Sequence, residues 1–521
     1  MNQFIQKHSK DVIGVLSGFD RLVLRGTLRG IAYPDGLKRY LWKVQVLLKD
    51  FKEHALAVTE RIKEAASRAA LAAGRPNRYL DSPSADKDKI AREVAAKDGI
   101  TAGHIATFTC LESSRSFYVA GNRETKKLEP KKRTRPCLHY YHYLIHPVFG
   151  WMNIRIQTWF PFTIHICLNG REWLSREMDK AKLPYERWEN SFAWIKDFEQ
   201  AQRLMNGQLA ANWPTLLNGL VREINPAHKA IFKKFPMDYY WSVHQSEWAT
   251  DITFRDRETL TRHYPALVHH GVTTFSCPDV LRFLGKPVPA SGKVSRNFRG
   301  EVTTDLKVRE EGVRLKHSVV GNSIKIYDKW VNLRSECTIN NAAGFKVYRP
   351  KEGDDTGKLD WRPLRKGIAD LHRRTEVSQA AINRYLDAMA AVDETTPLRD
   401  LVKDLCKPTS LGGARVRALN PWSPEDGGLL KAVNHGDFTI QGFRNRDIRQ
   451  LLFTSEPASK QEERQRSGIV TRRLRMLRAH GLIAKVPKSH RYQVTEKGRI
   501  VITALLTARD ANTAELTKLA A

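Results

Sequence analysis

Alternating apolar and polar residues predict strands in two separate regions of this chain. The first region is the segment Asp20–Leu28 followed by Ile105–Cys110, Ser116–Ala120, Leu138–Ile145, Met152–Trp159 and Thr163–Leu168. The second comprises Glu247–Phe254, resumes at Glu301 and includes the stretch from Glu310 to Arg349. Because the two faces of a half-buried strand alternate with period two, both regions are predicted to form mainly antiparallel sheet.

Helical spacing predicts the segments that separate these regions. Apolar residues recur every three or four positions from Leu37 to Ala69 and stop at Gly74, which predicts one long helix. Asp86–Lys97, Arg257–Gly271, the stretch from Gly170 to Phe235 and residues 361 to 405 are also predicted to be helical. The expected core positions of the last stretch are Ile368, Leu371, Ile382, Leu386 and Met389.

The C-terminal segment combines helical and strand patterns in a fixed order. A helix carrying Ile448, Leu451 and Leu452 precedes a second helix from about Gly468 to His480, which should bury Val470, Leu474 and Leu477. Gly481 should end that helix, and a hairpin follows with strands Leu482–Val486 and Arg491–Val494 and a turn at Lys488–His490. This order resembles the winged helix-turn-helix family over residues 437 to 503.

These patterns together predict an α+β fold. It should have mainly antiparallel sheet regions with inserted helices, then a helical connector and a C-terminal winged helix. The expected divisions are a sheet-and-long-helix domain (1–170), a helical segment (171–245), a second sheet region (246–350), a helical connector (351–436) and the winged helix (437–521). The alternative that the two sheet regions pair into one domain stays open.

The charge of the chain indicates a polyanionic partner. Lysine and arginine number 87 against 56 acidic residues, which gives a formal net charge of +31. Nucleic acid is the commonest such partner, because neutralising phosphates releases counterions. An anionic membrane is the alternative, but the sequence has no long apolar run and no signal peptide.

The six cysteines form no CxxC pair, which fits the reducing cytoplasm. The expected location is therefore cytoplasmic, or on the nucleoid in a bacterium.

Two clusters of basic residues are candidates for nucleic-acid binding. Residues 438 to 500 hold fifteen Lys and Arg against five Asp and Glu, and the recognition helix and wing would present Arg472, Arg473, Arg475, Arg478 and Arg491. The second cluster contains Lys131, Lys132, Arg133 and Arg135, beside the aromatic stretch from His139 to Tyr143. It is interpreted either as a solvated loop or as a surface for single-stranded nucleic acid.

The stretch from Glu310 to Arg349 carries the most chemistry. Its alternation predicts three strands and places Tyr327, Lys325 and Lys329 on one face of the second strand and Glu336 on a face of the third. A nearby cation lowers the cost of a phenolate, and a carboxylate can hold a divalent metal. The segment GNSIKIYDK followed by LRSE resembles the Rep_trans type of rolling-circle replication initiators. That resemblance implies that Tyr327 attacks a DNA phosphate and that Glu336 binds Mg²⁺ or Mn²⁺.

Two further carboxylates are candidates for the same metal site. Glu247 and Asp251 share one face of a predicted strand, opposite Trp248 and Ile252. They are either part of a metal site or ordinary solvated residues, and the solvated interpretation is favoured. A half-buried sheet tyrosine is likewise the structural alternative for Tyr327.

Two functions follow from these features. The first is a metal-dependent tyrosine DNA nickase or replication initiator of a mobile element, and the second is a non-catalytic DNA- or RNA-binding protein, such as a regulator or a ribonucleoprotein component. Single- or double-stranded DNA is the favoured partner, structured RNA is the alternative, and a homodimer is compatible with the sequence. The chain has no GxxxxGK[ST] and no HExxH, which argues against an ATP-driven motor and a zinc protease.

Overall fold

The computed structural model describes the chain in segments and divides it into two compact units. The described residues are 1–286, 300–309, 312–351, 357–390, 398–435, 438, 442–453, 455–487 and 489–511. The insert unit consists of Leu16–Trp248 and Arg365–His372, and the terminal unit of Met1–Val15, Ala249–Leu364 and Arg373–Ala521. Each unit is therefore assembled from segments that are far apart in the sequence. The fold is α+β, as predicted.

The insert unit is built on a sheet with the strand order β1-β6-β5-β4-β3-β2. All described pairings in it are antiparallel except that of β2 with β3. Its strands are β1 (Val12–Thr27, which starts in the terminal unit), β2 (Asn77–Leu80), β3 (Gly103–Gly121), β4 (Leu128–His146), β5 (Gly150–Gln157), β6 (Ile164–Asn169) and the hairpin β7 (Tyr185–Trp188) and β8 (Ser191–Ile195). Its helices are η1 (Arg29–Ile31), α2 (Pro34–Lys43), η2 (Leu48–Asp50), α3 (Phe51–Ala72), α4 (Lys87–Lys97), α5 (Gly170–Lys180), α6 (Phe198–Ala210), α7 (Trp213–Ile224), α8 (Ala227–Ile231) and η3 (Ile368–Asp370).

The terminal unit contains a second run of paired strands, in the order β10-β11-β12-β13-β9. These strands are β9 (Tyr240–Phe254, which starts in the insert unit), β10 (Val302–Arg309), β11 (Gly312–Val319), β12 (Asn322–Lys329) and β13 (Asn332–Ile339). The other strands are β14 (Lys346–Arg349), β15 (Asp360–Pro363), β16 (Thr409–Leu411), β17 (Ala414–Val416), β18 (Ile483–Lys485) and β19 (Tyr492–Val494). Its helices are α1 (Asn2–Lys7), α9 (Arg257–Thr273), α10 (Cys277–Phe283), α11 (Leu371–Met389), α12 (Leu398–Val402), α13 (Pro424–Val433), α14 (Asn445–Leu452), α15 (Lys460–Ala479) and α16 (Glu496–Asp510).

Several local predictions are confirmed by these elements. The helices α4 and α9 lie where the spacing predicts them, with Asp86 and Asp256 accepting N-cap hydrogen bonds. The five core positions expected in residues 361 to 405, from Ile368 to Met389, are all buried. In the part of the chain that the structure describes, no helix is both long enough and apolar enough to cross a membrane.

The single helix predicted from Leu37 to Gly74 is wrong, because the chain forms α2 and α3 instead. Gln45 adopts a positive φ of 61°, its N–H bonds to the Trp42 carbonyl, and the Val46 N–H bonds to the Leu41 carbonyl. This is a Schellman motif, which normally uses glycine at the position of Gln45. The sequence therefore carries no glycine signal for the break, whereas Gly74 ends α3 as predicted.

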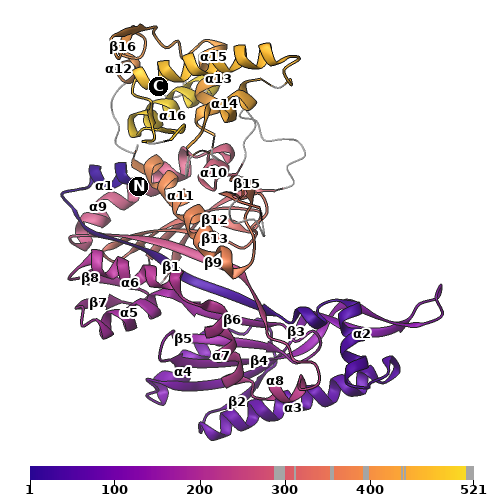
Figure 1. The fold of residues 1–521 in the computed structure, drawn as a ribbon. Coiled ribbons are helices and arrows are strands. Elements are labelled where there is room, and N and C mark those ends of the chain that lie inside the picture. Colours follow the sequence, from indigo (N-terminus) through magenta and orange to yellow (C-terminus); the bar gives the residue numbers. More distant parts are fainter. Residues whose placement is uncertain are drawn as a thin grey trace. The chain divides into compact units, whose positions relative to one another are not determined.

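Two other segment predictions are also corrected. The strands expected at Ile105–Cys110 and Ser116–Ala120 are one strand, β3, whose pairing with β4 runs from Gly103 to Gly121 and forms a long two-stranded ribbon (Figure 1). The hairpin β7–β8 interrupts the stretch from Gly170 to Phe235 that was predicted to be helical throughout. The aromatic residues Tyr185, Trp188 and Phe192 in this hairpin have high strand propensity, and this outweighed the apparent helical spacing.

The C-terminal elements share a core of their own. Val470, Leu474 and Leu477 of α15 are buried, as predicted, with Ile448 of α14 and Leu482 before β18. Gly481 adopts φ +72° where α15 ends, and β18 pairs with β19 in an antiparallel hairpin. The second helix is longer than expected because Ser459, rather than a residue near Gly468, caps it by accepting a hydrogen bond from the Glu462 N–H. Asp437 and Lys488 of the predicted segment lie outside the described residues.

Candidate nucleic-acid interface

Helix α15 presents basic side chains on the side opposite its buried residues. Arg472, Arg475 and Arg478 follow one another at intervals of three, so they share one face of the helix. Arg472 and Arg475 are exposed and Arg478 is half-buried. The Asn445 side chain at the start of α14 donates hydrogen bonds to the Ser467 carbonyl at 2.9 Å and to Thr471 Oγ1 at 2.8 Å, which fixes α15 against α14. The result is a rigid helix with one basic, accessible face.

Arg473 does not belong to this face. It lies one residue from Arg472, which is about 100° around the helix, and it is half-buried. Burial raises the pKa of Asp426 in α13, but hydrogen bonds from Arg417 and Asn420, together with the charges of Arg417 and Arg473, lower it to a net value below its usual range. Three of the four arginines predicted to contact nucleic acid therefore share one face, whereas the charge of Arg473 acts on Asp426 of α13.

The β18–β19 hairpin carries further basic residues beside α15. Lys485 is exposed and pairs in register with Tyr492, and Arg491 is half-buried directly before β19. The Val486 N–H bonds to the Arg491 carbonyl at 2.9 Å, so the hairpin pairing continues past the two short strands. The backbone thus places Arg491 beside the turn, at the tip of the hairpin.

The basic cluster of Lys131, Lys132, Arg133 and Arg135 lies in strand β4, so its interpretation as a loop is wrong. The register pairs Arg135 with Ser114, Arg133 with Ser116 and Lys131 with Tyr118, which puts three cations on one face of the ribbon. Arg133 stacks over Tyr118 at 4.6 Å, and Arg135 over Trp159 at 4.6 Å. Among the described residues, none of the four cations forms an ion pair with an acid. The positive charges of Lys131, Arg133 and Arg135 are therefore available to an external anion.

Lys132 differs from its three neighbours in direction. It points to the opposite face of the ribbon, where it lies 4.5 Å over Phe117 and donates a hydrogen bond to the Ala32 carbonyl. Burial, with the charges of Arg115 and Arg25, lowers its pKa. Lys132 therefore anchors the ribbon to the segment before α2.

The sheet face that carries Lys131, Arg133 and Arg135 also carries a row of basic residues that the sequence analysis did not find. Arg155 of β5 pairs in register with His165 of β6, which pairs with Arg25 of β1, and His244 of β9 lies 5.0 Å from His165 between ring centroids. We call Arg25, Arg155, His165 and His244 the basic row. Arg25 and His244 are exposed and the other two are half-buried. Alternation within each strand predicts the sheet face of each residue. The sequence does not show that the four residues are neighbours, because this depends on which strands pair.

Burial and neighbouring cations lower the pKa values of the histidines in and beside the basic row. Burial lowers the pKa of His165 to about 3, and the positive charges of Arg155, His244 and Arg25 contribute to that shift. Burial and Arg155 likewise lower the pKa of His139 to about 4. One acid, Glu112, lies beside the row and binds Arg155 at 2.8 Å, Lys87 at 3.3 Å and the Tyr141 hydroxyl at 2.6 Å. His165 is therefore neutral at neutral pH, and Arg25 and Arg155 carry the positive charge of the basic row.

The strand trio β11–β12–β13 brings Tyr327 and Glu336 onto one face, as predicted. The register places Tyr327 between Arg314 and Arg334, and Lys325 opposite Glu336, with which it forms an ion pair. Lys325 and Lys329 lie 5.7 Å and 5.9 Å from the centre of the Tyr327 ring. Four cations thus surround one tyrosine.

Tyr327 and its neighbours are buried, and this burial sets the protonation state of the Tyr327 hydroxyl. Tyr327 is 9% exposed, Lys329 6% and Glu336 2%. Burial, followed by the charge of Glu336, raises the pKa of Tyr327, and Lys325 and Arg314 offset only part of that rise. The hydroxyl is therefore protonated at neutral pH.

No family model, curated protein or solved structure matches this chain. Its function has to be inferred from these surfaces alone.

The two remaining metal-ligand candidates occupy different environments. Asp251 is 2% exposed, so its interpretation as a solvated residue is wrong. Both of its carboxylate oxygens accept hydrogen bonds from Arg334, at 2.6 Å and 2.9 Å. Glu247 belongs to the insert unit, where it accepts a hydrogen bond from Gln245. In the terminal unit, Asp251 and Glu336 serve as counter-charges of Arg334 and Lys325.

Proposed function

We propose that this chain is a cytoplasmic nucleic-acid-binding protein that uses two surfaces. In the terminal unit, α14, α15 and the β18–β19 hairpin act as a winged helix, whose recognition helix α15 enters the major groove of duplex DNA. In the insert unit, the basic ribbon and the basic row hold the phosphates of a single strand. The observation that carries the proposal is a set of exposed or half-buried cations on β4 and α15 that have no acidic partner among the residues that the structure describes.

The helix surface is tested by removing Arg472 and Arg475 together. The Arg472→Ala/Arg475→Ala variant should bind duplex DNA at least about thirtyfold more weakly, because each arginine contact to a base edge or phosphate contributes roughly 1–3 kcal/mol. Fluorescence anisotropy with labelled duplex DNA measures this. The control is Lys52→Ala/Arg68→Ala, which removes two exposed cations from α3 and should bind as the wild type does. Equal affinities of both variants would reject α15 as the contact surface.

The register of the strand trio favours a second candidate function, a metal-dependent tyrosine DNA nickase of a mobile element. Tyr327 would attack the phosphate, Lys325 and Lys329 would stabilise the phenolate, and Glu336 would hold Mg²⁺ or Mn²⁺. The buried ion pair of Lys325 with Glu336 would have to open first. The non-catalytic binder, which can act on DNA or structured RNA, requires no such opening and is therefore our preferred proposal.

The two functions are separated by the Tyr327→Phe variant. Full-length protein is incubated with labelled single-stranded DNA and Mg²⁺ or Mn²⁺, and covalent adducts are separated on denaturing gels. A nickase forms an adduct with the wild type and with the control Tyr79→Phe, which alters an exposed tyrosine on β2, but not with Tyr327→Phe. Binding without an adduct in all three proteins rejects the nickase and retains the binder.

A further inference from the structure

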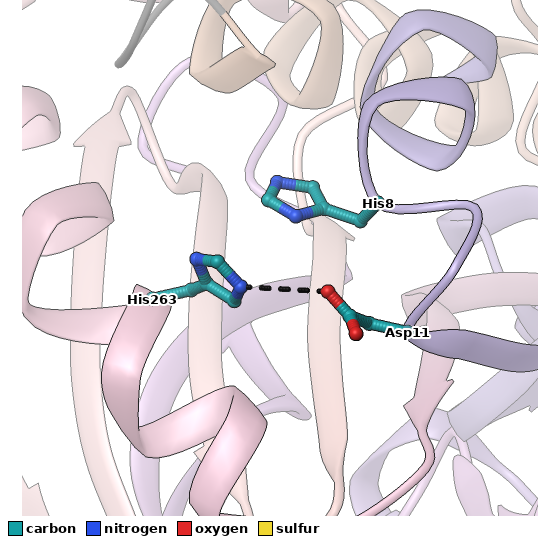
Figure 2. Close-up of side chains that lie close together, drawn as sticks. All are labelled: His8, Asp11 and His263. Carbon is teal, nitrogen blue, oxygen red and sulfur yellow. Dashed lines mark ion pairs between the residues drawn. The ribbon is translucent and has the colours of Figure 1, made fainter.

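Two histidines and one aspartate of the terminal unit converge on a common point. His8 is the residue that ends α1, Asp11 directly precedes β1, and His263 lies in α9. Figure 2 shows their side chains directed toward one another, with Asp11 paired to His263. One ligand atom of each residue lies within 4.8 Å of the other two. The His263 Nε2 atom is 3.7 Å from Asp11 Oδ2.

Backbone hydrogen bonds hold the three residues in place. The N–H groups of Asp11 and Val12 bond to the His8 carbonyl at 2.9 Å and 3.0 Å, which closes a turn between the first two ligands. The Arg255 N–H bonds to the Asp11 carbonyl at 2.8 Å, and this joins the turn to the end of β9. Helix α9 begins two residues later, with Asp256 as its N-cap. The group is therefore positioned before any ligand binds.

The surroundings of the three residues are apolar on one side and accessible on the other. His8 is 6% exposed and packs against the rings of Phe4 and Phe254, at 4.6 Å and 6.0 Å between centroids. The side chains of His263 and Asp11 are 27% and 35% exposed. An ion can enter from the side of these two residues, and a dry wall behind His8 strengthens its interaction with a cation.

The donor atoms select the class of ion. Two imidazole nitrogens and one carboxylate oxygen are the ligands of catalytic zinc sites, whereas Mg²⁺ and Ca²⁺ prefer oxygen alone. Bonds of about 2.0–2.2 Å to a tetrahedral ion separate ligand atoms by roughly 3.4 Å. The His263–Asp11 pair is already close to that separation at 3.7 Å. Small side-chain rotations would complete the site.

We propose that His8, Asp11 and His263 bind one divalent transition-metal ion of the Zn²⁺ class. Three protein ligands leave a coordination position for water or for an oxygen of an anionic ligand. The site is separate from the carboxylates predicted to bind Mg²⁺ or Mn²⁺, and it does not depend on the proposed nucleic-acid binding. The bound ion would also join α1 to α9.

Titration calorimetry of metal-free, full-length protein tests this proposal. The wild type should bind one Zn²⁺ per chain and should not bind Mg²⁺ at the same site. His8→Ala, Asp11→Asn and His263→Ala should each weaken Zn²⁺ binding by at least about 100-fold, because even indirect partners of metal ligands contribute 10- to 100-fold. The control His269→Ala removes an exposed histidine from the same helix, α9, and should leave Zn²⁺ affinity unchanged.

A second measurement covers the case in which a variant fails to fold. Zn²⁺ should raise the unfolding temperature of the wild type but not that of Asp11→Asn, which keeps the shape of the side chain, and with a chelator the two proteins should unfold alike. Wild-type protein that binds no Zn²⁺ overturns the proposal. The proposal is also overturned if all three ligand variants still bind one Zn²⁺ per chain, or if His269→Ala loses Zn²⁺ binding to the same extent as the ligand variants.

Discussion

At the scale of single residues, alternation in the sequence was enough to place the side chains of the strand trio but not to find all their partners. Tyr327, Lys325 and Glu336 share a face because successive residues of a strand point to opposite sides. The partner of Arg334 is Asp251, 83 residues earlier in the chain. No periodicity carries this information, because it depends on which strands become neighbours, and the prediction that Asp251 is solvated failed for that reason.

The Arg334–Asp251 pair gives the first stability prediction. Asp251→Asn should lower the free energy of unfolding by about 3–5 kcal/mol, because it leaves a buried guanidinium without its counter-charge. Urea unfolding followed by tryptophan fluorescence measures the loss. Asp400→Asn, which breaks an exposed pair with Arg399, should cost less than about 1 kcal/mol. A similar small loss in both variants would show that Arg334 does not depend on Asp251.

Buried histidines give a prediction on pH. Burial lowers the pKa of His142 to about 3, and a hydrogen bond joins its ring to Thr107. Below its unfolded pKa of about 6.5, the unfolded chain binds a proton that the folded chain does not, so stability falls as the pH falls. By pH 5 the loss from this residue should be about 2 kcal/mol.

The pH dependence of the unfolding temperature between pH 7.5 and 5 tests this assignment. His142→Gln should flatten the dependence, since glutamine does not titrate. His269→Gln, which replaces an exposed histidine on α9, should retain the wild-type dependence of the unfolding temperature on pH. An unchanged slope in His142→Gln would show that His142 does not carry the effect.

At the scale of elements, the sequence predicted where most strands and helices lie but not how long they continue. Strand β3 continues through the polar residues Ser113 to Ser116, because these residues pair with residues 133 to 136 of β4. Backbone pairing thus extends the strand where the sequence has no apolar alternation. Helix α2 ends at a Schellman motif built on Gln45 instead of glycine. In both cases backbone hydrogen bonding decided the element, and side-chain type did not.

The ribbon gives a prediction at this scale. Replacing Lys131, Arg133 and Arg135 by alanine should weaken binding to single-stranded DNA and reduce the slope of log affinity against log salt by about 2, since each phosphate contact on a single strand contributes roughly 0.7. Anisotropy at several salt concentrations measures the slope. The control replaces Lys52, Arg61 and Arg68, three exposed cations of α3. Equal slopes in the two triple variants would place the single strand elsewhere.

At the scale of the whole molecule, the hydrophobic patterns predicted the α+β architecture, and the net charge predicts a polyanionic partner. Neither could predict the division into units, because each unit combines segments from distant parts of the sequence. The basic row illustrates the consequence: its residues come from four strands, and they form a surface only when those strands pair. A net charge of +31 indicates that such surfaces exist but does not locate them.

The central claim is that the full-length chain binds nucleic acid through cations on its surface. The most direct test is the salt dependence of its affinity for duplex DNA. If Arg472, Arg475 and Arg478 of α15 each neutralise one phosphate, log affinity should fall with log salt with a slope of about −3. Arg472→Ala/Arg475→Ala should bring the slope to about −1. Wild-type protein that binds neither duplex nor single-stranded nucleic acid at low salt, or whose affinity does not change with salt, would contradict the account.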